Sequence, residues 1–438
     1  MTDSTEIAKP SKTGVALVLI ITLFFLWALT SNLIPTLIPH LKKACQLDDL
    51  QSAFIDSAYW IAYFVMAIPA ALIMRKYSYK TGIICGLVIA AIGAACFYPA
   101  AEIRQFGVFL GALFLMASGM TFLETAANPY ITVLGNPETS SQRLNFAQAF
   151  NGLGAFVSAF FLNKIILSGV DYTPEQLNAM QPSVLQNYLS GEAHRVQMPY
   201  LAIAAVLLLV ALLFYLTKLP PVTEEKTESF KIDFSVFKHR HFTNGVIAQF
   251  FYVGAQVCIS SFFIRYTKYT SGMSEAEVTN FHYLGYMLLC FMIGRYVGTF
   301  LMTKFKPQNL LTFYSVCNIL LLIYCVFIGG RLGLYAMMGI EFFMSIMFPT
   351  IFALSIKELG NQTKIGSSFM VMSIVGGAIV PLALGYISRN SNIQIAYIVP
   401  LICFFVVLYF GWKGYKIGGM HYELSDNKLQ MKVADATE

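Results

Sequence analysis

Long uninterrupted apolar runs constrain this chain more than any other feature of its sequence. They include Gly14 to Leu29, Tyr200 to Leu216 and Ala396 to Trp412, each near or above the roughly 17 residues that cross a bilayer as a helix. Hydrophobic residues make up 57% of the chain and charged residues only 12%, about half the charged share of a soluble protein. The chain is therefore predicted to be an all-α integral membrane protein.

Hydropathy and helix breakers predict twelve membrane-spanning helices in two sets of six. The first set is expected at 14–39, 51–74, 80–99, 105–134, 142–168 and 197–217, and the second at 242–268, 277–303, 309–329, 333–356, 365–388 and 395–415. The first run is predicted to be retained, because no small-residue cleavage site follows a short apolar stretch as in a signal peptide.

The segment Lys218 to Arg240 is the longest charged interior segment and separates the two sets. The predicted domains are a cytoplasmic N-terminus (1–13), an N-terminal six-helix bundle (14–217), a cytoplasmic linker (218–241), a C-terminal six-helix bundle (242–415) and a cytoplasmic tail (416–438). Lys and Arg residues concentrate on the side of the linker, which predicts that both termini are cytoplasmic and that the membrane is the plasma (inner) membrane. Residues 171–197 are predicted to lie on the outer side of the membrane, with a short helix at 174–180.

A weak internal repeat supports this division. FLETAANP at Phe122–Pro129 aligns with FFMSIMFP at Phe342–Pro349, and GAFV at Gly154–Val157 aligns with GAIV at Gly377–Val380. Two related bundles around a site near the bilayer midplane are typical of carriers that work by alternating access. A channel is disfavoured, because the halves lack a repeated filter or a charged ring.

Other functional classes find little support in the sequence. The eight cysteines form no CxxC or Cys/His cluster, so neither a metal nor another cofactor is expected. The net charge of +6 is explained by topology and requires no nucleic-acid partner. No nucleophile and base pair is evident, so the chain is not expected to be an enzyme.

Glu124 is the acid that stands out within the predicted spans. It lies one helical turn before Asn128, and Pro129 removes a backbone donor just beyond. A carboxylate, an amide and a freed carbonyl then share one helix face. Because ionisable groups within a membrane are costly, we expect Glu124 to carry a proton or bind a sugar, with a structural hydrogen bond as the alternative.

Besides Glu124, the mid-span acids are Asp56 and Glu341, and the one deep cation is Arg295. Asp56 shares a face with Tyr59 and Tyr63 and is a second candidate for proton coupling, with a structural partner role as the alternative. Glu341 is near the start of its span, so it either functions in transport or faces outer water. Arg295 is expected to pair with an acid or with helix-end carbonyls rather than with substrate.

Polar side chains recur at helical spacing in both halves. The predicted substrate-binding residues are Trp27, Asn32, Glu124, Asn128, Gln148, Asn151, Gln249, Tyr252 and Gln256. Amide stripes offer donors and acceptors to hydroxyl groups, and aromatic faces such as those of Trp27 and Tyr63 are available to stack on a sugar ring. Bonding between neighbouring helices is the alternative role for any single amide.

At these residues the sequence resembles the fucose/galactose/glucose symporter family of the major facilitator superfamily. The resemblance runs along nearly the whole chain and is most specific at LETAANPYITVLG (Leu123–Gly135) and RLNFAQAFNGLGA (Arg143–Ala155). Less specific matches are LFFLWA (Leu23–Ala28), YKTGIICGL (Tyr79–Leu87), FYPAAEI (Phe97–Ile103), AQFFYVGAQ (Ala248–Gln256), FMIGRYVGT (Phe291–Thr299) and FPTIFALSIKELG (Phe348–Gly360).

The resemblance implies a major facilitator fold and a proton-coupled sugar importer. It implies that Glu124 is the carboxylate that cycles through protonation, and that Asn151 and Trp27 contact the sugar. Three positions depart from the family pattern: Pro35 stands where an aspartate is usual, Ser260 where a tryptophan is usual and Phe348 where a tyrosine is usual.

The sequence therefore predicts import of a monosaccharide, L-fucose or a related hexose, by proton symport. A sodium-coupled or uncoupled sugar carrier is one alternative, and a non-transporting membrane sugar sensor is another. The expected partners are the sugar, a proton, with sodium as the alternative ion, and the lipid bilayer. Each chain is expected to function as a monomer.

Overall fold

The computed structural model describes residues 10–32, 49–158, 176, 179–194, 197–220, 232–273 and 283–417. The described chain is helical and has no strand in these ranges. Ten of its helical segments are long and apolar enough to cross a membrane, and Gly285–Leu301 is a shorter apolar helix. The sequence prediction of an all-α membrane protein is confirmed.

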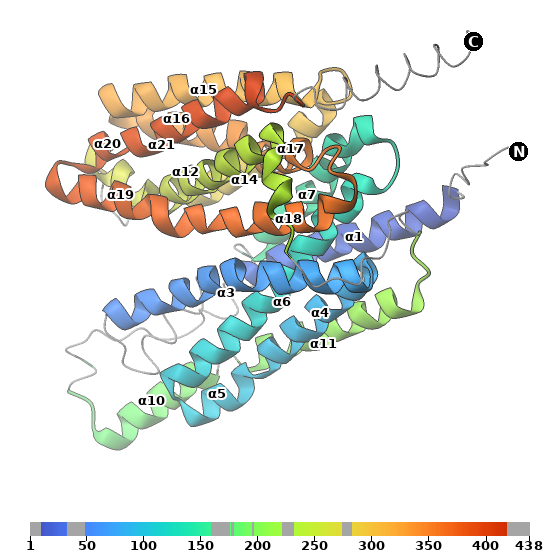
Figure 1. Ribbon diagram of the computed structural model, residues 1–438. Coiled ribbons are helices and arrows are strands. Elements are labelled where there is room, and N and C mark those ends of the chain that lie inside the picture. Colours follow the sequence, from blue (N-terminus) through green and yellow to red (C-terminus); the bar gives the residue numbers. More distant parts are fainter. Residues whose placement is uncertain are drawn as a thin grey trace, which may run out of the picture.

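Most helices of the first half lie in the lower part of Figure 1, while α7 (Ser140–Val157) reaches up beside α17 (Met347–Ser355) of the second half. The other elements of the first half are α1 (Pro10–Ser31), α3 (Asp49–Lys76), α4 (Tyr79–Ala95), α5 (Phe97–Ile103), α6 (Phe106–Val133), α10 (Pro182–His194) and α11 (Gln197–Leu216). Residues 159–168, the rest of the predicted fifth span, and Pro35 lie outside the described residues. In the predicted outer segment the structure describes α10, a helix that the sequence did not predict.

The second half is built from helices as well. Its elements are α12 (Arg240–Ser271), α14 (Tyr283–Leu301), α15 (Pro307–Phe327), α16 (Gly330–Met344), α17 (Met347–Ser355), α18 (Thr363–Met372), η5 (Ser373–Val375), α19 (Gly376–Asn390), α20 (Ile393–Ala396), α21 (Ile398–Tyr409) and η6 (Phe410–Gly414). The described chain begins and ends toward the same end of the molecule (Figure 1), as an even number of crossings requires.

Large apolar side chains cover the outer surface of the helices. Leu209 and Leu212 of α11 are 56% and 51% exposed, and Leu382 of α19 is 72% exposed. Apolar exposure of this extent marks a surface that meets another apolar phase. The helices therefore present a hydrocarbon-facing surface, as a bilayer requires.

Glycines allow helices to approach closely at equivalent places in the two halves. A Cβ atom on Gly154 of α7 would collide with the carbonyl oxygen of Phe25 in α1, and one on Gly376 of α19 would collide with that of Phe250 in α12. Small residues at such crossings are the usual basis of helix packing in membranes. The similar contact supports the internal repeat, although the glycine that makes it in the second half is Gly376, the residue before the aligned Gly377.

The described end of the linker meets the loop before α18. Asp233 caps the short helix η3 (Phe234–Lys238) by accepting from the backbone N–H of Ser235 at 2.9 Å. Its other carboxylate oxygen accepts from Gln362, in η4 (Gly360–Gln362), at 2.8 Å. The described end of the linker is thus fixed to the second half.

Candidate functional site

A cavity of about 440 Å³ lies between the two halves. The first half contributes side chains from α1, α3, α6 and α7, and the second from α12, α14, α17 and η5. Its polar and aromatic lining consists of Trp27, Asn32, Tyr59, Trp60, Tyr63, Glu124, Gln148, Asn151, Gln256, Ser260, Ser261, Phe291, Arg295 and Phe348. The volume falls within the range of small-molecule sites.

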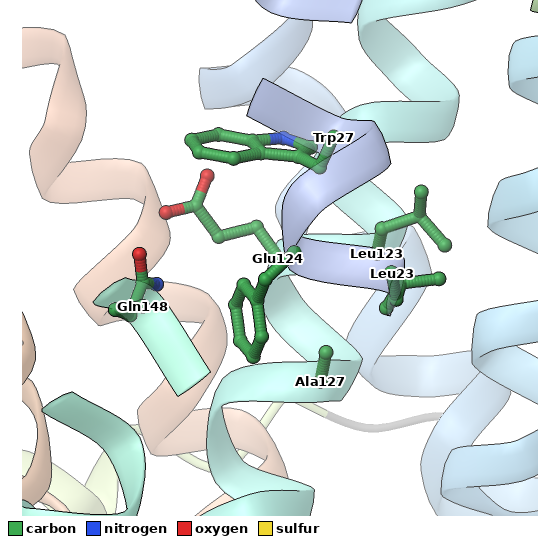
Figure 2. Close-up of a pocket in the computed structure, with 7 residues that line it drawn as sticks. Leu23, Trp27, Leu123, Glu124, Ala127 and Gln148 are labelled. Carbon is green, nitrogen blue, oxygen red and sulfur yellow. The ribbon is translucent and has the colours of Figure 1, made fainter. Parts of the chain in front are cut away.

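Glu124 contributes a buried carboxyl group to this cavity. The residue is 5% exposed, and its carboxyl group lies between the Trp27 indole and the Gln148 amide (Figure 2). Its Oε2 atom is buried without a hydrogen-bond partner among the described residues, and none of these forms an ion pair with it. A small cavity of about 10 Å³ adjoins it, close to the size of one water probe.

Aromatic hydroxyl and indole groups form a chain beside Glu124. Trp27 donates from Nε1 to the Tyr63 hydroxyl at 3.0 Å, and the Tyr59 hydroxyl donates to the same oxygen at 3.1 Å. Tyr63 is therefore an acceptor for two donors, which leaves its own O–H free to point elsewhere. These bonds fix the Trp27 ring at the cavity wall.

Amides form a second chain on the other side of the carboxyl group. Gln148 donates from Nε2 to Oδ1 of Asn128 at 3.0 Å, in the interior between α7 and α6. Asn128 is fully buried, and its Nδ2 has no hydrogen-bond partner among the described residues. Gln148 is thus held by Asn128 while it faces the cavity, and Asn128 supports the wall from behind.

Arg295 connects the halves at the cavity. It is 4% exposed, and it donates from Nε to the Ser345 carbonyl and from Nη1 to the Gln148 carbonyl, both at 2.7 Å. Its guanidinium also lies 4.6 Å from the centre of the Phe291 ring. The expectation that Arg295 pairs with helix-end carbonyls is confirmed at Ser345, which follows the last residue of α16.

Further contacts between the halves lie beyond the cavity. Asn145 of α7 donates from Nδ2 to the Thr350 hydroxyl of α17 at 3.0 Å. The ammonium of Lys364, in α18, lies 5.0 Å from the centre of the Tyr79 ring at the start of α4. Helix α18 also packs against α3 and α6, so the halves are in contact at the end where α18 begins.

A large part of the chain matches a known family. The model of the Major Facilitator Superfamily matches residues 19–381. This chain belongs to the Major Facilitator Superfamily. It is therefore a multi-pass membrane transporter and not an enzyme, and the two six-helix halves are those of the family fold.

Individual members of the family are similar along nearly their whole length. The L-fucose-proton symporter of Escherichia coli (strain K12) is 43% identical over 401 residues, which cover 90% of this chain and 91% of that protein. The glucose/galactose transporter of Brucella abortus biovar 1 is 39% identical over 415 residues, with 94% and 97% covered. The resemblance to the fucose/galactose/glucose symporter family is confirmed.

A solved structure of one member is also similar. The crystal structure of the transporter FucP in the outward conformation superposes with a TM-score of 0.85 at 42% identity, covering 91% of this chain and 98% of that chain. The proton:xylose symporter XylE superposes with a TM-score of 0.65 at 12% identity, which is a likeness of fold alone.

The structure brings six of the nine predicted substrate-binding residues to the cavity: Trp27, Asn32, Glu124, Gln148, Asn151 and Gln256. Asn128, Gln249 and Tyr252 are fully buried behind it, and Tyr252 donates to the Met344 carbonyl at 3.0 Å. Asp56 lies in α3, but its side chain is outside the part that the structure describes. The roles of all ten predicted site residues stay predictions.

Several lining residues were absent from the predicted site, although Tyr63, predicted to offer an aromatic face to the sugar, does line the cavity. Tyr59 and Trp60 lie four and three residues before Tyr63 in α3, a helical spacing that indicates the same side of the helix. Ile374 and Phe348 line the cavity from helices whose apolar sequence carries no local signal. Their positions depend on how the second half crosses the first.

Proposed function

We propose that this chain imports a monosaccharide, L-fucose or a related hexose, by proton symport with alternating access. The observation that carries the proposal is Glu124, a buried carboxyl group facing a cavity between the halves. An ionised carboxylate within a membrane is costly unless it is paired. A group that takes up and releases a proton here links proton movement to the side of the membrane on which the cavity is open.

The lining suits a polyhydroxylated ring. Trp27 and Trp60 offer aromatic faces, while Gln148, Asn151 and Gln256 offer both donors and acceptors. Aromatic faces bind the apolar faces of sugar rings and amides bind their hydroxyl groups. The names of the relatives, L-fucose-proton symporter and glucose/galactose transporter, support the same substrate class.

The contacts between the halves support alternating access. Arg295 and Asn145 each bond across the interface, and α18 packs on the first half at one end. We place that end at the cytoplasm, because the lysine-rich and arginine-rich segments and both termini lie there by the positive-inside rule. The proposed domain boundaries, at 13, 217, 241 and 415, follow from the same reasoning, as does location in the inner membrane.

Uptake into proteoliposomes tests the coupling. Labelled L-fucose, D-galactose and D-glucose are offered with and without an inward proton gradient, and with sodium in a separate arm. We expect accumulation of at least one sugar above equilibrium only with the proton gradient. Accumulation driven by sodium alone would favour the sodium-coupled alternative, and equilibration without any gradient effect would favour an uncoupled carrier.

Two variants localise the coupling. Glu124→Gln should abolish accumulation, because the amide carries no transferable proton, while exchange of sugar across the membrane is retained. Glu102→Gln is the matched control, because Glu102 lies at the end of its span, away from the lining, and bonds Gln197 at 3.0 Å. Gradient-driven accumulation that survives Glu124→Gln would overturn the role of Glu124. One chain per particle should suffice, since a single chain lines the cavity.

A further inference from the structure

A second buried carboxyl group lies behind the opposite wall of the cavity. Glu341 of α16 is 3% exposed, so the alternative that it faces outer water is wrong. It accepts a hydrogen bond at 3.0 Å from the hydroxyl of Ser260 in α12. Ser260 lines the cavity and is exposed to it, whereas Glu341 does not line it.

The surroundings of Glu341 leave Ser260 as its hydrogen-bond donor. The guanidinium of Arg295 is occupied by the Ser345 and Gln148 carbonyls, and no described residue forms an ion pair with Glu341. The titratable groups that act on it electrostatically are Tyr252, Cys290 and Tyr397. No cation competes with Ser260 for the carboxylate in the described structure.

The direction of this hydrogen bond determines what Ser260 can offer to a ligand. A serine hydroxyl has one donor hydrogen and two acceptor lone pairs. Because the hydrogen is directed to Glu341, only lone pairs remain for the cavity. A free serine would rotate to suit either a donor or an acceptor. At Ser260 the hydrogen is held by Oε1 of Glu341, an oxygen that accepts whether the other carboxyl oxygen is ionised or protonated.

We propose that Ser260 is a specificity-determining contact that accepts a hydrogen bond from one sugar hydroxyl, and that Glu341 is the positioning residue that fixes its polarity. This inference rests on the proposed function, since it assumes a sugar in the cavity. Glu341 and Glu124 then have different tasks on opposite walls: one orients an acceptor for the substrate, and the other carries the proton.

Sugar binding to purified protein tests whether Ser260 acts as a hydrogen-bond acceptor, and it requires no proton gradient. Fluorescence quenching reports on the cavity, because Trp27 and Trp60 both line it. The probes are the best-bound hexose of the uptake screen, its monodeoxy analogues and its deoxyfluoro analogues. A deoxy group neither donates nor accepts, and fluorine accepts weakly but cannot donate.

We expect one ring position at which the deoxy and deoxyfluoro analogues bind the wild type equally weakly, about 3- to 10-fold below the parent sugar, as for the loss of one hydrogen bond. In Ser260→Ala the parent and both analogues should bind within about twofold of one another at that position. Ser271→Ala is the control, because Ser271 ends the same helix away from the cavity lining. Its hydroxyl donates to the Thr267 carbonyl and accepts from the Met273 N–H, both of the backbone.

Glu341→Gln separates positioning from a structural role. The amide keeps the size of the side chain and can still bond Ser260, but it can donate as well as accept. Ser260 can then turn its hydrogen to the cavity, so the fluoro analogue should bind better than the deoxy analogue at the same position. A merely structural role would lower the binding of all three probes in parallel.

The outcomes distinguish this inference from the proposed function. If the wild type binds none of the sugars, both fail. If it binds sugars, but Ser260→Ala keeps the full discrimination against the analogues, only the role of Ser260 fails. If Glu341→Gln leaves the deoxy and fluoro analogues equally weak, the positioning role of Glu341 is overturned.

Discussion

Arg295 of the second half donates a 2.7 Å hydrogen bond to the backbone carbonyl of Gln148 in the first. The same Gln148 holds Asn128 through its side chain and faces the cavity beside Glu124. One arginine therefore joins the interface between the halves to the wall of the site. A motion that separates the halves at this level must break that bond.

Loss of this bond should impair transport strongly. Hydrogen bonds to charged groups contribute about 1.5–3 kcal/mol each, so Arg295→Gln should lower the uptake rate at least about tenfold. Arg295→Lys should be nearly as damaging, because lysine lacks the planar fork that reaches two carbonyls. Uptake of labelled sugar measures both variants.

The matched control for Arg295 is Arg265→Gln. Arg265 lies 5.5 Å from the centre of the Phe262 ring, so it also makes a cation–π contact, but it is exposed and does not line the cavity. Its replacement should leave uptake within about twofold of the wild type. Normal uptake by Arg295→Gln would show that the interface bond is dispensable.

Trp27 should contribute both a ring face and a hydrogen bond. Trp27→Phe keeps an aromatic face but removes the donor to Tyr63, which should raise the KM about fivefold, for the loss of about 1 kcal/mol. Trp27→Ala removes the face as well and should raise it further. Trp412→Phe is the control, because Trp412 is 60% exposed. Equal KM values for the Phe and Ala variants would contradict the contribution of the ring face.

Gly376 should be required for packing in the second half. Gly376→Ala places a methyl group against the backbone oxygen of Phe250, which cannot move away cheaply, so it should destabilise the protein by about 1–3 kcal/mol. Gly385→Ala is on the same helix with no atom within 4 Å of the added Cβ. It should be neutral or slightly stabilising. Thermal unfolding in detergent compares the two, and equal stabilities would refute the close approach.

Asp233 should stabilise the linker more strongly in its ionised form than in its protonated form. Hydrogen bonds from Ser235, and then from Gln362, lower the pKa of Asp233 below its usual value. A lowered folded-state pKa gives stability that is present above the unfolded pKa and lost as pH falls through the folded one. Asp233→Ala should therefore cost about 0.5–1 kcal/mol at pH 7, and the difference from wild type should shrink below about pH 4.

The control for Asp233 is Asp233→Asn, which still caps η3 without a titrating group. Its stability relative to Asp233→Ala should not change with pH over the same range, because neither side chain titrates. Thermal unfolding at several pH values between about 3 and 7 provides the measurement. A constant difference between wild type and Asp233→Ala down to the lowest pH would contradict the linkage.

The spans and the acid at the site could be predicted from sequence because each depends on local properties. Span positions follow from length and hydropathy, which act on a helix one at a time. Glu124 was recognisable because an ionisable residue inside an apolar run is costly wherever it points. For the cavity, the sequence indicated only that amide and aromatic side chains recur at helical spacing. It did not indicate which of them meet around one space.

Which side chains of a polar stripe reach the cavity, and which are buried against a neighbouring helix, could not be predicted. Gln249, Tyr252 and Gln256 follow one face of α12, yet only Gln256 lines the cavity, while Tyr252 bonds the Met344 carbonyl. Helical spacing determines on which face of a helix a residue lies. It does not determine what covers that face, because different neighbouring helices cross it at different positions along the helix. The same reason hid the pairing of Ser260 with Glu341, which are 81 residues apart.

The cavity is lined by residues from Trp27 to Ile374, so its wall is complete only when nearly the entire chain has been synthesised and inserted. A ligand stabilises only the species that binds it. Substrate in the medium can therefore protect the finished carrier from degradation but cannot assist the insertion of its first half. During synthesis, the first six helices must persist in the bilayer on their own packing.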